Sequence, residues 1–412
     1  MTSLSAPSAR GPEAAPVRSG RSGRPHHWRA WVPLISGVAA VLLVFHLAGG
    51  WFFAGVLHDS ALDVEVRRNE LDRSYDVEVI DVTENRITFA TDHEEAGRKG
   101  VWGVAWEGGY GLLSGPVRIT GPHVVRDFTQ VDGSPLDRDN LVDLDTRAFP
   151  DRPAAVLGTE PLDVAIDGPL GRYDTWLFPG RRATWALLGH GNGLDRLDLG
   201  KLLPALTQAG YPVLLVPMRN DPGLPTDPSG MLRYGDTEWA DLEAAVDFAL
   251  ASGADDVVPI APSMGGGVVL TFLERSDSAN EVRGAVLDAP LIDFGRAVDH
   301  QAADESLPVI GLPPPASLTA TAKWIAGWRF DVDWDATGHL DETDRLRTPL
   351  LIFHGTADAD VPIATSREFA GARPDLVTLV EVDEAPHLAS WNLDPAGYER
   401  RLIEFLDRVA AS

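Results

Sequence analysis

The pattern of apolar and polar positions divides the chain into three unlike parts. Trp31 to Leu57 is an uninterrupted run of 27 residues without a charged side chain. Residues 58–159 contain short alternating runs, which are typical of half-buried β-strands. From residue 160 onward, apolar strands alternate with stretches of helical spacing, which is typical of an α/β sheet. We therefore expect an apolar helix, a β-rich accessory region and an α/β domain, in that order.

The apolar run from residue 31 to 57 is long enough to cross a membrane. At about 1.5 Å per residue, its length exceeds the roughly 30 Å of a bilayer's hydrocarbon core. Aromatic side chains typical of membrane interfaces lie near both ends, at Trp28, Trp31, Trp51, Phe52 and Phe53. A cleaved signal peptide has a shorter apolar region of about 7–15 residues followed by a small-x-small site. An uncleaved transmembrane anchor is therefore favoured over a cleaved signal or a buried core helix.

Charge is distributed unevenly along the chain, and this distribution predicts which side of the membrane each flank of the anchor occupies. The whole chain has a net charge of −26, but residues 1–30 carry five Arg and one Glu. Because basic flanks tend to stay in the cytoplasm, we predict a disordered basic cytoplasmic tail over residues 1–30. Residues 58–412 are then extracytoplasmic, in a single-pass protein of the cell membrane. So acidic a chain is a poor candidate for binding nucleic acid.

Residues 58–159 are expected to form a β-rich accessory domain or an extended N-terminal sheet. Four strands are predicted: Val77–Val82 and Arg86–Ala90, which form a hairpin, and then Val101–Trp106 and Val117–Thr120. The glycine-rich segment 108–111 separates the last two, and residues 132–153, rich in Asp, Pro and Arg, are interpreted as a loop. We find no chemical motif in this region.

The α/β part is predicted to start at residue 160. Its expected strands are Thr184–Leu188, Tyr211–Val216, Val257–Ile260, Arg283–Leu287, Leu350–Phe353 and Val377–Val382. Its expected helices are Leu199–Ala209, Thr237–Ala251, Gly265–Glu274 and Tyr398–Ala411.

Ser263 has the sequence setting of a nucleophile. It lies in the segment Ala261-Pro262-Ser263-Met264-Gly265-Gly266-Gly267, which follows an apolar strand and opens a helix. A serine on a sharp strand-to-helix turn needs small neighbours, because backbone and helix crowd together there. Ala261 and Gly265 meet that need. The alternative is a serine that only caps a helix with a glycine-rich first turn.

Two backbone groups are candidates for an oxyanion hole. His190-Gly191-Asn192-Gly193 directly follows a predicted strand, where glycines let a backbone N–H turn toward a carbonyl under attack. We expect the N–H groups of Asn192 and Met264 to bind the oxyanion. An ordinary glycine turn after a strand is the alternative interpretation.

An aspartate and a histidine late in the chain complete a possible catalytic triad. Asp358 follows the predicted strand 350–353, and a carboxylate at that point can hold a histidine in the required tautomer. Asp360 and Asp288 are rival acids. His387 lies in the loop after the last predicted strand, from which it could reach the serine as general base.

With these motifs in this order, the chain resembles the α/β-hydrolase superfamily over roughly residues 160–412. Ala261 stands where the family usually has glycine. The segment from Gly210 to Asn220 is similar to the family's second strand and following loop. Tyr234-Gly235 and Glu238–Asp241 look like the serine-peptidase-related branch, with prolyl-oligopeptidase-like and monoacylglycerol-lipase-like members. The resemblance implies a mostly parallel sheet flanked by helices, and a covalent acyl-enzyme mechanism.

Residues 291–347 are expected to form a small cap, because insertions at this point often cover the pocket in the superfamily. The segment 319–328 is predicted to be helical. Its tryptophans Trp324 and Trp328 suggest either a covered acyl pocket or simple core packing.

Together these features predict a membrane-anchored serine hydrolase that cleaves a carboxylic ester or an amide. Three alternatives stay open: an acyltransferase on the same triad, a peptidase, and a catalytically silent α/β-hydrolase-fold module for interactions at the envelope. The expected partners are a small-molecule ester, lipid or peptide substrate, and the membrane through residues 31–57.

No cofactor and no metal is expected. The absence of cysteine excludes disulfides, a thiolate nucleophile and cysteine-ligated zinc. The alternating aspartates at 331, 333 and 335 and at 137 and 139 have the spacing of calcium ligands, but the full loop pattern is missing. We interpret both as solvated acidic loops.

Overall fold

The computed structural model describes residues 27–411 except 70–72, 91–93 and 308–310. The chain divides into residues 1–48 and a larger unit, Gly49–Ser412. Helix α1 (His27–Leu57) begins four residues before the predicted anchor, and most of the predicted tail lies outside the described residues. One described helical stretch, Ser36–Leu62, is long and apolar enough to cross a membrane, with a mean hydropathy of 2.0.

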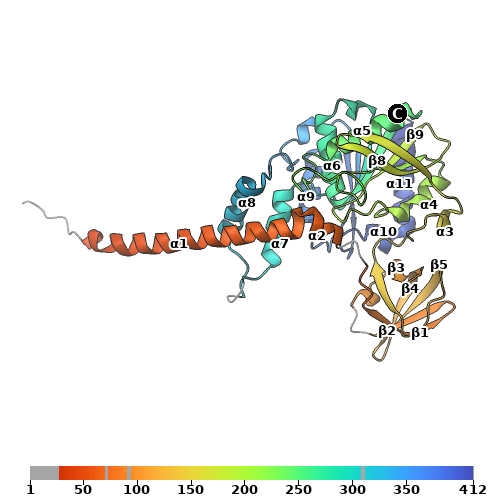
Figure 1. Cartoon of the computed structure of the whole chain (residues 1–412), viewed down its shortest axis with the longest axis horizontal. Coiled ribbons are helices and arrows are strands. Elements are labelled where there is room, and N and C mark those ends of the chain that lie inside the picture. The colour runs from red at the N-terminus through yellow and green to blue at the C-terminus, as the bar shows by residue number, and fades with distance from the viewer. Residues whose placement is uncertain (1–26, 70–72, 91–93, 308–310, 412) are drawn as a thin grey trace, which may run out of the picture. The chain divides into compact units, whose positions relative to one another are not determined.

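A short helical segment and a closed barrel follow α1. The helical segment consists of a π-helical turn (His58–Leu62) and α2 (Val64–Asn69). The barrel strands are β1 (Val77–Thr83), β2 (Arg86–Ala90), β3 (Trp102–Trp106), β4 (Gly109–Thr120), β5 (His123–Gly133) and β6 (Leu141–Asp145). All its pairings are antiparallel, in the order β1-β2-β5-β4-β3-β6. Figure 1 labels β1 to β5 of this barrel. Closure leaves no free sheet edge for unwanted pairing.

The β-rich character and the β1–β2 hairpin are confirmed, but two expectations for this region are wrong. The glycines at 109 and 111 pair with β3 inside β4, rather than separating two strands. Residues 132–153 are not all loop, because they contain β6. In β6, Val142 is buried in the barrel core while Asp143 and Asp145 bind Arg73. The acidic composition suggested a loop there. Arg73, which binds these aspartates inside the fold, lies about 70 residues earlier and is not apparent from the local sequence.

The rest of the chain forms one eight-stranded sheet with helices on both faces (Figure 1). The strand order is β14-β13-β12-β11-β9-β10-β8-β7. The strands are β7 (Leu162–Gly168), β8 (Gly171–Phe178), β9 (Thr184–Leu188), β10 (Val213–Leu215), β11 (Asp256–Pro262), β12 (Ala285–Asp288), β13 (Leu350–Gly355) and β14 (Val377–Val382). Strands β9 to β14 pair in parallel, and β7 and β8 form an antiparallel hairpin at one edge that the sequence did not predict.

The helices after the barrel are α3 (Ala154–Leu157), α4 (Leu203–Gln208), α5 (Trp239–Ala251), α6 (Ser263–Arg275), α7 (Phe294–Asp304), α8 (Ala316–Phe330), α9 (Ile363–Ala372), α10 (Ser390–Leu393) and α11 (Pro395–Ala410). Short 3₁₀ turns lie at Glu94–Gly97, Gly200–Leu202, Asp277–Glu281 and Thr343–Arg345.

The core lies on both faces of the central strands. Every residue of β9, β11 and β13 is buried, so these strands show no alternation of polar and apolar side chains. One face packs against α5 and α6, and the other against α4 and α11. With the faces covered, the carboxyl ends of the parallel strands carry the loops on which polar side chains meet.

Helices α7 and α8 form the insertion between β12 and β13. The predicted helix 319–328 lies within α8, but its tryptophans are not part of a covered pocket or of the core. Trp324 is 67% exposed and Trp328 is 72% exposed. The buried side of α8 packs instead against the last turns of α1, where Ala54 contacts Ile325 and Ala326. Helical spacing predicted α8 correctly, but it could not show which face of the helix is covered.

Candidate functional site

Ser263 lies on a tight turn between β11 and α6. It is the first residue of α6 and has a φ of 46°, a left-handed conformation that is rare for residues other than glycine. A side chain at Gly265 would collide with the backbone oxygen of His190, and one at Gly266 would collide with Pro290. Small residues are therefore required around this serine, and the hydroxyl is held at the start of the helix.

The structure brings Ser263, His387 and Asp358 together in one hydrogen-bonded row. The Nε2 atom of His387 lies 3.1 Å from the Oγ atom of Ser263. The Nδ1 atom of His387 lies 2.8 Å from the Oδ2 atom of Asp358. Asp358 follows β13 and His387 follows β14, so loops at the ends of neighbouring parallel strands supply the acid and the base. This is the arrangement needed to withdraw a proton from a serine hydroxyl.

The surroundings of the row hold Asp358 in its charged form. Burial alone would raise the pKa of Asp358, but hydrogen bonds from His354 and His387 outweigh burial and hold it well below its usual range. Burial alone would lower the pKa of His387, but the hydrogen bond and charge of Asp358 raise it. The carboxylate therefore favours the protonated imidazole that forms when a serine is deprotonated.

His354 is a further member of this cluster that the sequence analysis missed. It is fully buried in β13, and its Nε2 atom lies 3.1 Å from the oxygen of Val361 and 3.3 Å from the Oδ2 atom of Asp358. Its Nδ1 atom lies 2.8 Å from the hydroxyl of Ser366. The signal in the sequence was the His-Gly pair at the end of an apolar strand, four residues before Asp358.

The rival acids occupy different positions. Asp360 is exposed, and its backbone N–H donates to the Oδ1 atom of Asp358 at 3.0 Å. Asp288 ends β12 in a buried position, and burial raises the pKa of its carboxyl. Within the described part of the chain, Asp358, Asp360 and His387 also have ligand atoms within 4.8 Å of one another. Two of these three residues are hydrogen-bonded to each other in the row.

The loop that carries Asn192 lies beside the nucleophile. A side chain at Gly191 would come within 3.5 Å of the Cβ atom of Ser263. The N–H of Gly191 donates to Asp198 at 3.0 Å. The predicted oxyanion donors are the N–H of Asn192 and the N–H of Met264, a residue that is buried. The assignment of these two donors stays a prediction.

His190 anchors the start of the same loop. Its ring is fully buried, and its Nε2 atom lies 3.0 Å from the Oδ1 atom of Asp221. Burial disfavours the charged imidazole, but Asp221 outweighs that effect and raises the pKa of His190 to about 9. At neutral pH, a charged imidazole therefore lies beside Asp221 at the start of this loop.

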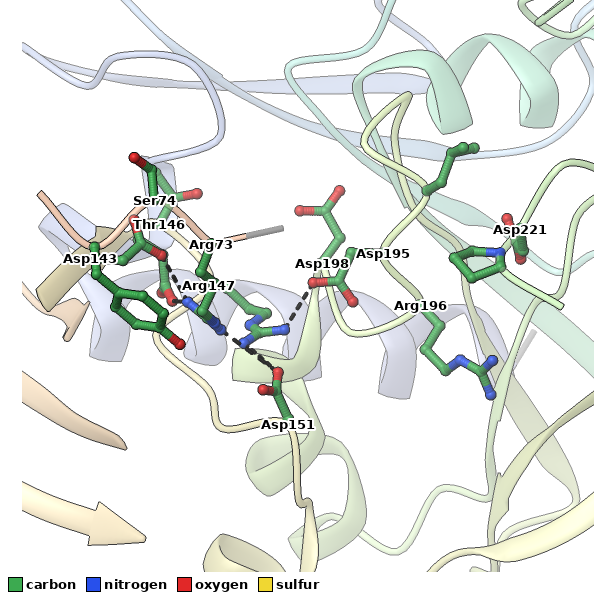
Figure 2. A pocket seen from close by; sticks show the side chains of 14 residues that line it. Arg73, Ser74, Asp143, Thr146, Arg147, Asp151, Asp195, Arg196, Asp198 and Asp221 are labelled. Atoms are coloured by element: carbon green, nitrogen blue, oxygen red, sulfur yellow. Dashed lines mark hydrogen bonds and ion pairs between the residues drawn. The ribbon is translucent and has the colours of Figure 1, made fainter. Parts of the chain in front are cut away.

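A mixed-charge cavity of about 920 Å³ adjoins this loop. Figure 2 shows Arg147 bridging Asp151 and Asp195 across it, with nitrogen–oxygen distances of 2.6 and 2.8 Å. Its walls come from residues 143–151 on the barrel side and residues 194–198 on the side of the sheet. The barrel therefore helps to line a polar space next to the predicted oxyanion loop.

Lys201 is a second residue that the sequence analysis missed. It connects the loop that carries His387 to the segment that follows the barrel strand β6. It is buried, and its Nζ atom donates to the backbone oxygen of Leu388 at 3.0 Å and to that of Thr146 at 3.1 Å. It also donates to the side-chain oxygen of Asn392 at 2.8 Å. Asn392 in turn donates to the backbone oxygen of Val101, at the entry to β3, at 2.7 Å. One buried ammonium group thus fixes the residue that follows His387.

We expect Lys201→Met to lower kcat for ester hydrolysis by about 10- to 100-fold with little change in KM, because misplacing a catalytic group by about 1 Å costs roughly that much. The matched control is Lys99→Met, which removes an exposed ion pair between Lys99 and Glu384 of the same loop and is expected to change little. Steady-state kinetics below the unfolding temperature of each variant measures both effects. A folded Lys201→Met protein with the kcat of the unchanged chain would contradict this positioning role.

Comparisons with known proteins show similarity of fold at low sequence identity. An esterase of Pyrococcus furiosus matches with a TM-score of 0.50 and 20% identity, over 63% of this chain and 94% of its own. A thermophilic esterase of Thermogutta terrifontis matches with a TM-score of 0.45 and 20% identity, over 60% of this chain and 99% of its own. A Xanthomonas campestris protein described as an α/β serine hydrolase without lid gives a TM-score of 0.41 and 17% identity, over 63% and 96%.

No protein-family model matches the sequence, and no curated protein matches it either. The Pyrococcus match and the mostly parallel eight-stranded sheet with a strand-to-helix serine turn confirm the predicted α/β-hydrolase fold. At this identity the comparison concerns the fold alone.

Proposed function

We propose that the protein is a membrane-anchored serine hydrolase that cleaves carboxylic esters through an acyl-enzyme intermediate. The observation that carries the proposal is the hydrogen-bonded row from Asp358 through His387 to Ser263. The name of the Pyrococcus esterase, which has a similar fold, supports the ester-cleaving class. We also propose that the protein belongs to the serine-peptidase-related branch of this superfamily, which has monoacylglycerol-lipase-like members. This assignment is based on the resemblance of residues 234–241.

The first half of the reaction acylates the serine. The Oγ atom of Ser263 attacks the ester carbonyl carbon while the Nε2 atom of His387 takes the hydroxyl proton. Asp358 stabilises the imidazolium that results. The N–H groups of Asn192 and Met264 stabilise the oxyanion, assisted by the N-terminal end of α6. His387 then gives its proton to the departing alkoxide, which leaves as an alcohol.

The second half restores the enzyme. His387 removes a proton from water, which attacks the acyl carbon, and the same two N–H groups bind the second oxyanion. When this intermediate collapses, Ser263 leaves as the alkoxide and recovers the proton from His387. One ester and one water thus become one alcohol and one carboxylic acid.

The proposal places the enzyme at the cell membrane with its catalytic domain outside the cytoplasm. The apolar helical stretch Ser36–Leu62 supports anchoring. The five arginines within residues 1–30, and the excess of acidic residues after residue 57, support this orientation.

A fluorophosphonate probe tests the proposal on the full chain in phosphatidylcholine vesicles. We expect stoichiometric labelling, with the adduct on the peptide that carries Ser263, and turnover of p-nitrophenyl esters that exceeds turnover of the matching anilides. A folded protein that is neither labelled nor active would contradict the proposal and favour a silent interaction module. Faster cleavage of the anilides would favour a peptidase.

The pH dependence of the reaction follows from the shifted pKa of His387. Only the neutral imidazole can accept the serine proton, and Asp358 raises the pKa of His387 above its ordinary value. We expect kcat/KM to be highest at alkaline pH and to fall as pH drops through a value above 6.5. Asp358 stays ionised throughout, because its pKa lies well below its usual range. A profile of kcat/KM on a neutral ester from pH 5 to 10 measures this. A midpoint below pH 6 would contradict the assignment of His387 as the base.

A further inference from the structure

The exposed face of α8 is unusual for a surface helix because tryptophan occupies it. Ala320, Trp324 and Trp328 follow one another at intervals of four residues, which places them along one face. All three are exposed, and the two tryptophans are among the most exposed large apolar side chains of the described residues. Exposed apolar patches of this kind mark places where a protein contacts a partner or a membrane.

Helix α8 is fixed against the end of α1. A side chain at Gly50 would come within 2.8 Å of Thr321 and 3.1 Å of Ile325, so the two helices approach closely there. The ring centroids of Trp51 and Trp328 are 6.4 Å apart. Trp51 and its neighbour Phe52 are themselves about half exposed. The aromatic side chains of α8 therefore continue the apolar surface of the last turns of α1.

We call this surface the aromatic cap surface; it consists of Trp51, Phe52, Trp324, Trp328 and Arg329. Arg329 is exposed, and the centre of its guanidinium group lies 4.3 Å from the ring centroid of Trp51. Tryptophan rings together with a basic side chain are suited to the headgroup region of a bilayer, where the rings meet the acyl boundary and the cation meets phosphate.

We propose that the aromatic cap surface is a membrane-binding surface that lies in the headgroup region of the bilayer. Continuity with the apolar helix favours a bilayer over a protein partner, because a chain that leaves the membrane at the end of α1 brings α8 to the same interface. The exposed aspartates at 331, 333 and 335 follow α8 directly. They disfavour strongly anionic lipid, so the surface suits zwitterionic phospholipid.

This surface has a consequence for substrates that rests on the proposed function. The insertion that carries α8 begins at the nucleophile, where the N–H of Leu291 donates to the backbone oxygen of Ser263 at 2.9 Å. Helix α7 of the same insertion contacts the loop after β13 that carries Asp358, since Gln301 donates to the backbone oxygen of Asp360 at 3.1 Å. Docking of α8 on a bilayer would hold the active site near esters that reside in the membrane surface.

The chain has no cysteine, so a single introduced cysteine can carry a nitroxide label at one chosen position. Ala320→Cys places one thiol on the exposed face of α8 and leaves both tryptophans intact, and Ile119→Cys places one on the barrel at a position that is 72% exposed. Each full-length variant receives a nitroxide label in phosphatidylcholine vesicles. Oxygen concentrates in the bilayer, whereas a nickel complex stays in water. We therefore expect the label at 320 to be relaxed more by oxygen than by the nickel complex, and the label at 119 to be relaxed more by the nickel complex.

Equal access of the nickel complex to both labels would overturn the membrane-binding proposal. Shielding of the label at 320 from both reagents would also overturn it, because that result indicates a protein partner or a second copy of this chain.

A second arm tests the consequence for substrates. In the double variant Trp324→Ser and Trp328→Ser, we expect KM for a long-chain ester dispersed in phosphatidylcholine vesicles to rise about tenfold. KM for p-nitrophenyl acetate in water is expected to stay unchanged. Equal changes for both substrates would overturn the consequence. Inactivity of the unchanged protein toward both esters would count against the proposed function instead, while the nitroxide measurement would still decide the membrane contact.

Discussion

Replacing Ser263 with alanine is expected to lower kcat for ester hydrolysis by a factor of about 10⁴ or more. The hydroxyl is the attacking atom of the proposed mechanism, so water would have to attack without covalent catalysis. The fold should survive, because alanine keeps the small volume that the turn between β11 and α6 requires. Fluorophosphonate labelling should disappear together with the activity, and circular dichroism should remain unchanged.

The matched control for this substitution is Ser278→Ala. Ser278 is a half-buried serine beyond the end of α6 whose hydroxyl donates to Asp247 at 2.9 Å. We expect this variant to retain its activity and its labelling. If Ser263→Ala kept more than a few per cent of the starting kcat, the nucleophile would have to be another group and the proposed mechanism would be wrong.

Asp358→Asn is expected to lower kcat by about 10⁴-fold, the cost of a wrongly held histidine tautomer in a comparable triad. The Oδ1 atom of Asp358 accepts the backbone N–H groups of Asp360 and Val361 at 3.0 and 2.9 Å. An asparagine would keep its oxygen there and turn its NH₂ group toward His387. The Nδ1 atom of His387 would then have to accept a hydrogen bond, leaving the proton on Nε2. In that tautomer the imidazole cannot take the proton of Ser263.

Asp360→Asn is the matched control, because it makes the same chemical change two residues away on an exposed side chain. The charge of Asp360 contributes to the raised pKa of His387, so its loss should move the acidic limb of the pH profile slightly toward lower pH. We expect kcat at the pH optimum to change by less than about threefold. Equal losses in the two variants would mean that the two carboxylates share the role of the acid.

Local patterns were most informative where one element by itself carries the signal. The sequence predicted the apolar run of α1, the parallel strands and the glycine-rich turn at Ser263, because each is a property of a few consecutive residues. The same holds for Asp358 and His387, since polar residues that end parallel strands meet at one edge of a sheet. Their sequence positions were sufficient to predict the row that the structure shows.

Other features depend on partners that are remote in the chain. Strand β6 was mistaken for a loop because its aspartates are neutralised by Arg73, about 70 residues earlier. Lys201 resembles any surface lysine in the sequence, and only its burial against Thr146, Leu388 and Asn392 indicates a positioning role. Charged residues normally stay exposed, so a buried one is visible only once its acceptors are assembled around it.

By itself, the sequence determined the order of the parts, the fold class and the identity of the three residues of the row, because helix and strand periodicity and turn chemistry act over short distances. Only the tertiary structure decided that the accessory region closes into a barrel, that His354 and Lys201 support the row, and that Trp324 and Trp328 face outward. The reason is the same in each case. Which face of an element is covered, and which buried charge has a partner, depends on packing between segments that are distant in the chain.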